Sequence, residues 1–178
     1  MSVEVARLDA TSFARAVGEL ADLLVDAVAG GASVGFLPPF GHAQASAWWH
    51  TLQQDVARGS VVVLAARAGG GIVGTAQLRL AQLPNARHRA EVAKVLVHRA
   101  FRRRGIARAL MNELDRVARA EARSLLVLDT LTGSEGERLY EALGWTKAAV
   151  IPDYAMYPDE GLRPGGGGSP TSSGTPGY

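Results

Sequence analysis

A cluster of arginines in front of a glycine is the part of the sequence best suited to binding a charged ligand. The segment reads Arg102, Arg103, Arg104, Gly105, Ile106 and Ala107. Apolar residues at helical spacing follow, so a helix is expected to begin here. The first N–H groups of a helix have no intrahelical partner, and the helix dipole gives them partial positive charge. The segment therefore predicts a pyrophosphate site, although a solvent-exposed basic turn would have the same pattern.

Several ligand classes are excluded by what the sequence lacks. No Lys-Ser/Thr pair follows Gly105, as it would in a nucleoside-triphosphate loop, and the segment is not the Gly-x-Gly-x-x-Gly of a dinucleotide site. The absence of cysteine excludes a thiolate nucleophile and a cysteine-bound zinc. The four histidines lack the His-Glu-x-x-His spacing, so we expect no metal. A net charge of +2 does not indicate nucleic acid as a partner.

Two carboxylates and a tyrosine lie where they could move a proton. Glu91 falls within a predicted strand, and Asp129 follows an apolar strand at the carboxyl edge, where open α/β sheets bind ligands. Tyr140 falls on a predicted helix. A carboxylate can hold an alkyl ammonium and relay its proton, whose removal costs about 4 kcal/mol near neutral pH. A hydroxyl can protonate a departing thiolate, so these three residues are the candidates for acid–base catalysis.

Each candidate also has a purely structural interpretation. On a regular strand Lys94 points to the face opposite Glu91, so Glu91 would have to pair with Arg89 instead. Asp129 could simply begin a turn, and Tyr140 could belong to the core.

The elements that would position these residues alternate between strands and helices. Strands are predicted at 3–8, 61–66, 72–83, 89–97, 125–128 and 145–150, and helices at 13–28, 42–57, 106–118 and from Gly133 or Ser134 to 144. Thr11 or Ser12 is the expected cap of the first helix. The order β-α-α-β-β-β-α-β-α-β predicts a mixed α/β sheet with helices on both faces, in which three consecutive strands are antiparallel.

One domain is expected over residues 1–164, followed by a disordered tail over 165–178 that is rich in glycine, serine and proline. No apolar run is long enough to span a membrane, and the N-terminus lacks the basic and apolar regions of a signal peptide. We therefore expect a cytoplasmic protein that does not act at a membrane.

Two segments carry a resemblance to a known family. Arg102–Ala107 matches the Gln/Arg-x-x-Gly-x-Gly/Ala signature of GNAT acetyltransferases, and Leu139–Trp145 resembles their tyrosine helix followed by Gly-Phe/Trp. Three further segments, Gly30–Phe36, Arg89–Val92 and Leu128–Thr130, resemble the tabtoxin resistance protein, an acetyltransferase of a β-lactam amino acid. The resemblance implies a GNAT fold with a mostly antiparallel sheet.

The resemblance also implies an activity and a role for each site residue. The expected reaction is direct transfer of an acetyl group from acetyl-CoA to a primary amine of a small molecule, without a metal. Glu91 and Asp129 would accept the proton of the amine, and Tyr140 would act as general acid. The cofactor contacts would be Leu96, Val97, Arg102, Arg103, Arg104, Gly105, Ile106, Ala107, Ser134 and Tyr140, and the acceptor contacts would be Ser33 and Phe36. A protein N-terminal or lysine acetyltransferase, or a non-catalytic acyl-CoA sensor, are the alternatives.

The sequence departs from the family pattern at its end. Related proteins turn into a final strand after the position of Gly161–Pro164, but here four glycines follow. Because glycine is a poor strand former, we expect the final strand to be missing. The apolar strand 125–128 would then have an open edge, which either strand 145–150 or a second copy of the chain in a homodimer would cover.

Overall fold

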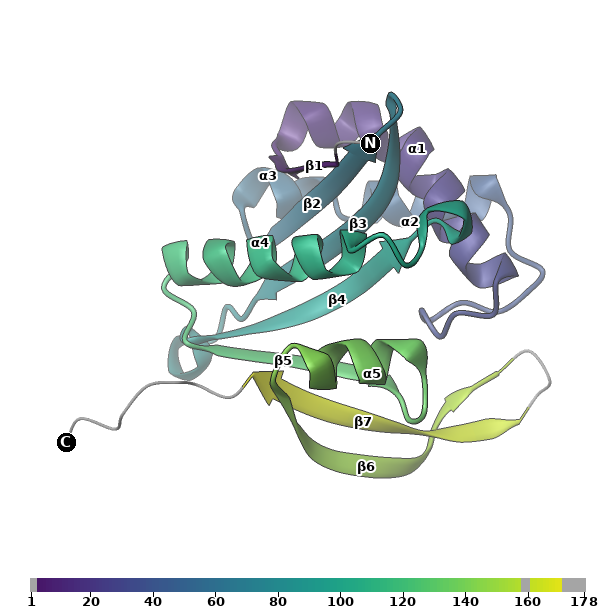
Figure 1. The fold of residues 1–178 in the computed structure, drawn as a ribbon. Helices are drawn as coiled ribbons and strands as arrows, with labels where there is room; N and C mark the ends of the chain where they lie inside the picture. The colour runs from purple at the N-terminus through teal and green to yellow at the C-terminus, as the bar shows by residue number, and fades with distance from the viewer. Residues whose placement is uncertain (1–2, 158–160, 171–178) are drawn as a thin grey trace.

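Seven strands form one sheet in the order β1-β2-β3-β4-β5-β7-β6 in the computed structural model, which describes residues 3–157 and 161–170 (Figure 1). The strands are β1 (Glu4–Leu8), β2 (Val61–Ala68), β3 (Gly71–Leu80), β4 (Arg89–Val97), β5 (Leu125–Leu131), β6 (Trp145–Met156) and β7 (Leu162–Pro170). The helices are α1 (Ala10–Ala29), α2 (His42–Thr51), α3 (Gln53–Arg58), α4 (Ile106–Ala120) and α5 (Glu135–Ala142), with short 3-10 turns η1 (Pro84–Ala86) and η2 (Arg99–Phe101). The predicted mixed sheet is confirmed, with β4 and β5 as its parallel pair.

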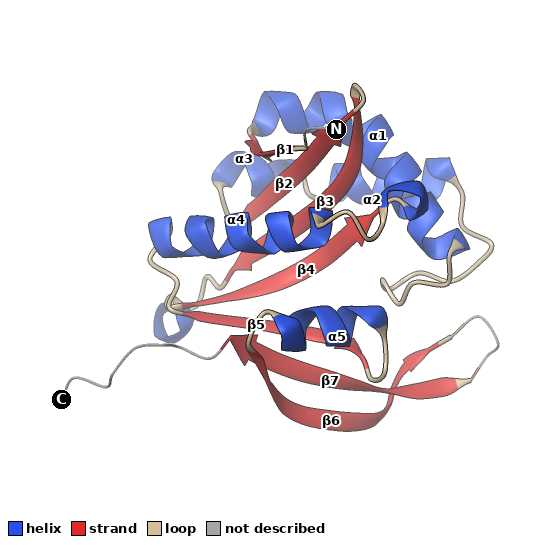
Figure 2. Cartoon of the chain, viewed as in Figure 1, coloured by secondary structure: helices blue, strands red, loops and turns tan. Residues whose placement is uncertain are grey.

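The helices cover both faces of this sheet, as predicted (Figure 2). On one face, α1 buries an apolar stripe that includes Phe13, Leu20 and Leu24 against the strands, together with α2 and α3. On the other face, α4 buries Leu110 and Leu114 in a second core. Within residues 3–157 and 161–170, no helix is both long and apolar enough to cross a membrane.

The cap of the first helix and the continuity of the second differ from the prediction. The cap of α1 is Asp9, whose carboxylate accepts a hydrogen bond from the backbone N–H of Ser12 at 2.7 Å, rather than Thr11 or Ser12. The single helix predicted over 42–57 is divided at Leu52 into α2 and α3. The hydroxyl of Thr51 donates to the carbonyl of Trp48 at 2.6 Å, and the N–H of Leu52 turns to the carbonyl of Trp49. This competition with the regular helical hydrogen bond tightens the last turn of α2.

β4 and β5 run parallel but are paired only where they begin. The register joins Arg89 to Leu125 and Glu91 to Val127, and after this point the two strands diverge (Figure 1). From residue 92 to 97, the edge of β4 that faces β5 has no strand partner in the described part of the chain. The backbone N–H and C=O groups of this edge make no strand hydrogen bonds, so a ligand can bind there.

An irregularity in β4 changes which side chains share a face. The pairing with β3 shifts between Thr75 and Gln77, and Lys94 has a positive φ of 51°. Such a bulge adds one residue and reverses the alternation of side chains beyond it. The expectation that Lys94 points away from the face of Glu91 is therefore wrong. Val95, which was expected to share that face, packs with the α4 core instead.

The expectation that the final strand is missing is also wrong. Residues 165–168 lie in β7, which pairs with Leu128–Leu131 of β5 on one edge and with β6 on the other. Strand β6 therefore does not pair with β5 directly, and the edge that suggested a homodimer is covered by β7. The domain includes residues 165–170, which were expected to be disordered, whereas 171–178 lie outside the described residues.

The glycines of β7 are explained by their surroundings. A Cβ atom at Gly165 would overlap the ring of Tyr154, and one at Gly168 would lie 3.0 Å from the carbonyl oxygen of Thr146. Strand propensity reflects the packing of side chains, whereas the ladder of hydrogen bonds needs only the backbone. A glycine run can thus form an inner strand where its neighbours leave no room for side chains.

One glycine of this run has room for a side chain, and this yields a test. A Cβ at Gly167 would meet only the carbonyl oxygen of Leu128, at an ordinary 3.6 Å. We expect Gly167→Thr to raise the free energy of unfolding by about 0.5–1 kcal/mol, since threonine favours strands and restricts the unfolded chain. The matched change Gly165→Thr should destabilise the protein because of the Tyr154 ring. Urea unfolding measures both, and equal effects would show that β7 is placed wrongly.

Candidate active site

The divergence of β4 and β5 opens into a cavity with a volume of ≈ 880 Å³. Its walls come from β4, β5, the beginnings of α4 and α5, the loop that follows α1, and the β6–β7 hairpin. A volume of this size is typical of small-molecule and cofactor sites. The cavity contains two chemically different ends, a basic one and one that carries carboxylates.

The basic end lies at the N-terminus of α4, as the sequence predicted. Gly105 caps the helix with a φ of 78°, and nothing lies within 4 Å of the position of a Cβ there. Of the predicted cofactor contacts, these line the cavity: Leu96, Val97, Arg102, Arg103, Gly105, Ile106, Ala107, Ser134 and Tyr140. Arg108 lines it as well. Arg104 does not, because its guanidinium lies 5.3 Å from the ring centroid of Phe101.

The arginines of this loop are partly held in place by their neighbours. The Nε of Arg102 donates to the carbonyl of Val97 at 3.3 Å, and Arg103 lies 3.5 Å from a carboxylate oxygen of Glu135. Ser134 caps α5, since its hydroxyl accepts from the backbone N–H of Glu137 at 3.1 Å. The first turns of two helices therefore meet at this end of the cavity.

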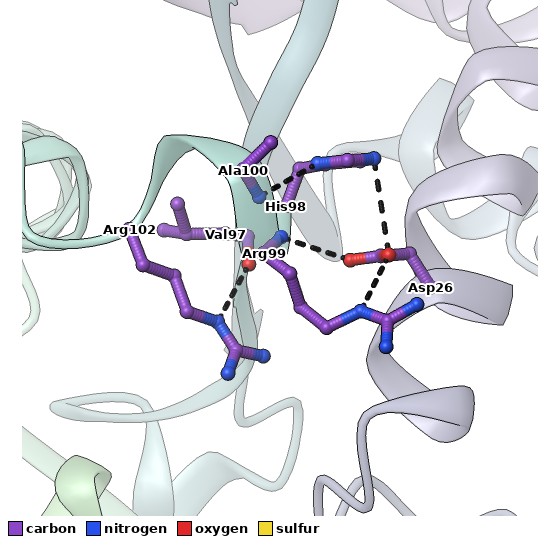
Figure 3. A network of polar contacts seen from close by, with 6 residues as sticks. All are labelled: Asp26, Val97, His98, Arg99, Ala100 and Arg102. Carbon is purple, nitrogen blue, oxygen red and sulfur yellow. Dashed lines mark hydrogen bonds and ion pairs between the residues drawn. The ribbon is translucent and has the colours of Figure 1, made fainter.

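A single carboxylate, that of Asp26 at the end of α1, ties the basic loop to the N-terminal half of the sheet (Figure 3). It accepts hydrogen bonds from the backbone N–H of Arg99 at 3.0 Å and from the Nε of Arg99 at 2.8 Å. The Nε2 of His98 lies 3.8 Å away, while its Nδ1 accepts from the N–H of Ala100 at 3.2 Å. These contacts fix the turn η2, from which Arg102 extends toward the cavity.

These contacts shift the pKa of Asp26. Burial alone would raise the pKa, but the hydrogen bonds from Arg99 and the charges of His98 and Arg99 outweigh burial and lower it. A carboxylate with a lowered folded-state pKa stabilises the protein above its unfolded pKa of about 4, and this contribution is lost as the pH falls through the folded value.

Asp26→Asn is therefore expected to lower the free energy of unfolding by about 1–2 kcal/mol at neutral pH. The difference from the wild type should shrink as the pH falls through the lowered pKa of Asp26, because the wild-type carboxylate then becomes protonated as well. Denaturant unfolding as a function of pH measures it. Asp22→Asn, on the same helix with a side chain that is 78% exposed, is the matched control and should have little effect. A loss that is unchanged at acid pH would mean that the charge of Asp26 is not what stabilises the turn.

The three predicted catalytic residues all line the same cavity. Glu91 lies on β4 beside Arg79 of β3, with 4.0 Å between the nearest guanidinium nitrogen and carboxylate oxygen, so its ionic neighbour is Arg79 and not Arg89. Asp129 lies on β5, where the pairing register places it opposite Gly167. Tyr140 lies on α5, with its ring 5.8 Å from that of Trp145.

The tyrosines near Asp129 are held in their protonated form. Burial, and then the negative charge of Asp129, raise the pKa of Tyr140 to about 12. Burial likewise raises the pKa of Tyr154 on β6, and the negative charges of Asp129 and Glu91 raise it further. Both phenols therefore keep their protons at neutral pH and are able to donate them.

The two predicted acceptor contacts have different positions. Ser33 lines the cavity. Phe36 does not, because its ring stacks on Phe40 at 4.5 Å and contacts Trp48 edge-on at 5.4 Å. The ammonium of Lys94 lies above these rings, 5.8 Å from the centroid of Phe36 and 5.2 Å from that of Trp48. Phe36 thus contacts Lys94, which lines the cavity, but Phe36 itself does not line it.

Arg79, Lys94 and Tyr154 are among the polar residues of the cavity wall that sequence reasoning missed. Burial, followed by the positive charge of Arg79, lowers the pKa of Lys94, while Asp129 and Glu91 act in the opposite direction. A lysine within the apolar segment 92–97 of this strand is a signal that could have indicated a special position. Tyr154 lies beyond the predicted end of its strand, so nothing in the periodicity pointed to it.

Comparison with known proteins agrees with this geometry. Residues 15–145 match the model of the acetyltransferase (GNAT) family. Among solved structures, yncA from Salmonella typhimurium, with its cofactor acetyl-CoA, is 18% identical with a TM-score of 0.76, covering 100% of this chain and 98% of that one. An N-acetyltransferase from Staphylococcus aureus Mu50 is 16% identical with a TM-score of 0.76, covering 95% and 98% of the two chains. A ribosomal-protein-alanine N-acetyltransferase from Brucella melitensis is 18% identical with a TM-score of 0.74, covering 93% and 98%.

At these identities the solved structures share the fold, while the family match extends over most of the chain, from α1 to the first residue of β6. The matched segment contains the arginine loop, Glu91, Asp129 and Tyr140. The chain therefore belongs to the GNAT family of acetyl-CoA-dependent N-acetyltransferases.

Proposed function

We propose that the protein transfers an acetyl group from acetyl-CoA to the primary amine of a small molecule. The observation that carries this proposal is that one cavity joins the arginine loop at Gly105 to the carboxylates of Glu91 and Asp129. The loop at Ser33 and the β6–β7 hairpin at Tyr154 both border the cavity. Walls on two sides favour a small molecule over a protein as the acceptor. A cytoplasmic location, and an antibiotic such as a β-lactam amino acid as acceptor, belong to the same proposal.

The residues at the basic end fit the pyrophosphate of acetyl-CoA. The open space above Gly105 admits a ligand to the first-turn N–H groups of α4, and Arg102 and Arg103 add positive charge. The unpaired edge of β4 at Leu96 and Val97 offers backbone groups to an extended amide chain. Acetyl-CoA supplies the acetyl group as a reactive thioester.

The residues at the other end suit proton transfer. The acceptor arrives as an ammonium ion with a pKa of about 10.4 and must lose a proton before it can attack. Glu91 and Asp129 would bind this ammonium and take up the proton, directly or through water. Tyr140, which keeps its own proton, would donate a proton to the departing thiolate.

Release of free thiol from acetyl-CoA, followed with a panel of amino acids, β-lactam analogues, polyamines and short peptides, tests the proposal. Acetylation of a small amine, confirmed by the mass of the product, would support it. Acetylation of peptides alone would favour a protein acetyltransferase. Tight binding of acetyl-CoA without thiol release from any acceptor would favour a sensor and contradict the proposal.

The contribution of the arginine loop has its own expected result. Arg102→Glu should weaken the affinity for CoA by about tenfold or more, which corresponds to ~1.4 kcal/mol. The loss should diminish at high salt, because salt screens the charges. Arg104→Glu is the matched control, since Arg104 does not line the cavity, and it should have the smaller effect. Calorimetry measures the affinity of both variants for CoA. An equal loss of affinity in the two variants would indicate that Arg102 acts through its long-range electrostatic field and not through a direct contact.

A further inference from the structure

The position of Lys94 is unusual for a lysine. It occupies the bulge of β4 with a φ of 51°, a strained conformation for a residue with a side chain. Its ammonium rests on the rings of Trp48 and Phe36 and lines the cavity. No carboxylate of the described residues forms an ion pair with it, although largely buried lysines are normally paired. The cavity wall therefore carries an ammonium group that forms no ion pair with the described residues.

Arg79 brings a second positive charge to the same wall. It lies opposite Glu91 in the β3–β4 register, and its guanidinium is only loosely bonded, 4.0 Å from Glu91 and 3.5 Å from the carboxamide oxygen of Gln77. Its Nε is buried without an acceptor in the described structure. Near the candidate catalytic carboxylates, Lys94 and Arg79 therefore offer hydrogen-bond donors that other residues do not use fully.

We propose that Lys94, assisted by Arg79, is an anion subsite of the acceptor pocket, and that the acceptor is an amine that also carries a carboxylate, as an amino acid does. This inference rests on the proposed function, whose small-molecule amine it specifies further. The ammonium of such an acceptor binds between Glu91 and Asp129, while its carboxylate binds at Lys94. Two negative and two positive side chains thus match the two charges of a zwitterion.

The aromatic rings provide a reason why Lys94 stays in place without a ligand. Rings attract a cation through their negative faces, so Trp48 and Phe36 hold the ammonium without neutralising it. A ligand carboxylate can then pair with a charge that is already desolvated and oriented. Lys94 could instead serve only to hold the loop that contains Phe36. Its replacement would then change kcat/KM equally for all acceptors, which distinguishes this structural role from an anion subsite.

The test compares acceptors in matched pairs, each an amino acid and its decarboxylated amine, at saturating acetyl-CoA. The wild type should prefer the amino acid by about tenfold or more in kcat/KM, as expected for a site with a dedicated polar partner. Lys94→Met keeps the length and apolar contacts of the side chain but removes the charge. It should lose this preference, because kcat/KM should fall much more with the amino acid than with the plain amine. Lys147→Met, which removes the other lysine of the sequence outside the cavity wall, is the control and should keep the wild-type preference.

The subsite proposal would be overturned if Lys94→Met kept the wild-type preference. It would also be overturned if kcat/KM fell equally for the amino acid and its decarboxylated amine. A second readout keeps this outcome separate from the proposed function. In the full chain bound to CoA and labelled with [ε-13C]lysine, the NMR signal of Lys94 should shift on titration with N-acetyl amino acids but not with N-acetyl amines lacking the carboxylate. The signal of Lys147 should not move. If no amine is acetylated, the proposed function fails, and a Lys94 signal that ignores carboxylates would then overturn the subsite independently.

Discussion

Replacing both cavity carboxylates, as Glu91→Gln and Asp129→Asn, is expected to lower kcat/KM by about 10²–10⁴-fold while the affinity for acetyl-CoA stays unchanged. Both side chains line the cavity from β4 and β5 and are not part of the arginine loop, so their loss should not disturb the binding of the pyrophosphate. The variant cannot take up the proton of the ammonium, which must then be lost to water. Steady-state thiol release and calorimetry with CoA measure the two quantities separately.

The pH dependence sharpens this expectation. The acceptor is most fully protonated at low pH, so the variant should be impaired most there, and the gap should narrow as the pH approaches the amine pKa of about 10. Tyr140 stays protonated over this range because its pKa is about 12, so it adds no titration of its own below that value. Asp115→Asn, on α4 outside the cavity wall, is the control for removal of a carboxylate. A constant gap at all pH values would mean that the carboxylates position the acceptor and do not take its proton.

Much of the site was predictable because its signals are local. The bounds of β4 and the start of α4 follow from β-branched residues, a glycine and helical spacing within a short stretch, and they agree with the structure. The arginine loop lies between these two elements, so its place at a helix N-terminus followed as well. The grouping of Glu91 and Asp129 followed from the family resemblance, and both line one cavity because β4 and β5 are neighbouring parallel strands.

The remaining features depend on partners far away in the sequence. The bulge at Lys94 arises from the register between β3 and β4, and the residues around Lys94 do not predict a bulge. The position of the lysine side chain was therefore assigned to the wrong face. The glycines of β7 carry no side-chain pattern, so their composition indicates a disordered tail. Only the ring of Tyr154 and the neighbouring backbone of β6 give a reason for glycine at these positions.

The role of β7 leads to the other large expected effect, which a pair of truncations would reveal. Removing residues 165–178 should unfold the C-terminal half of the sheet, whereas removing only 171–178 should leave β7 intact and change stability little. The first truncation deprives Leu128–Leu131 of its partner and separates β6 from the rest of the sheet. An apolar edge strand without cover recruits other chains, so aggregation is expected as well.

The loss should exceed about 3 kcal/mol or prevent recovery of folded protein, because a whole inner strand is removed and not a single contact. Hydrogen exchange followed by mass spectrometry would locate the effect. Protection should disappear in β6 and in Leu128–Leu131 of β5, but it should persist in β2 and β3, which pack against α1 on one face and α4 on the other. Thiol release should cease, since Asp129, Tyr154 and Gly165 all border the cavity. A longer truncation that kept both its melting temperature and its activity would show that the glycine strand does not hold this half of the domain together, and the open edge of β5 would again need another partner.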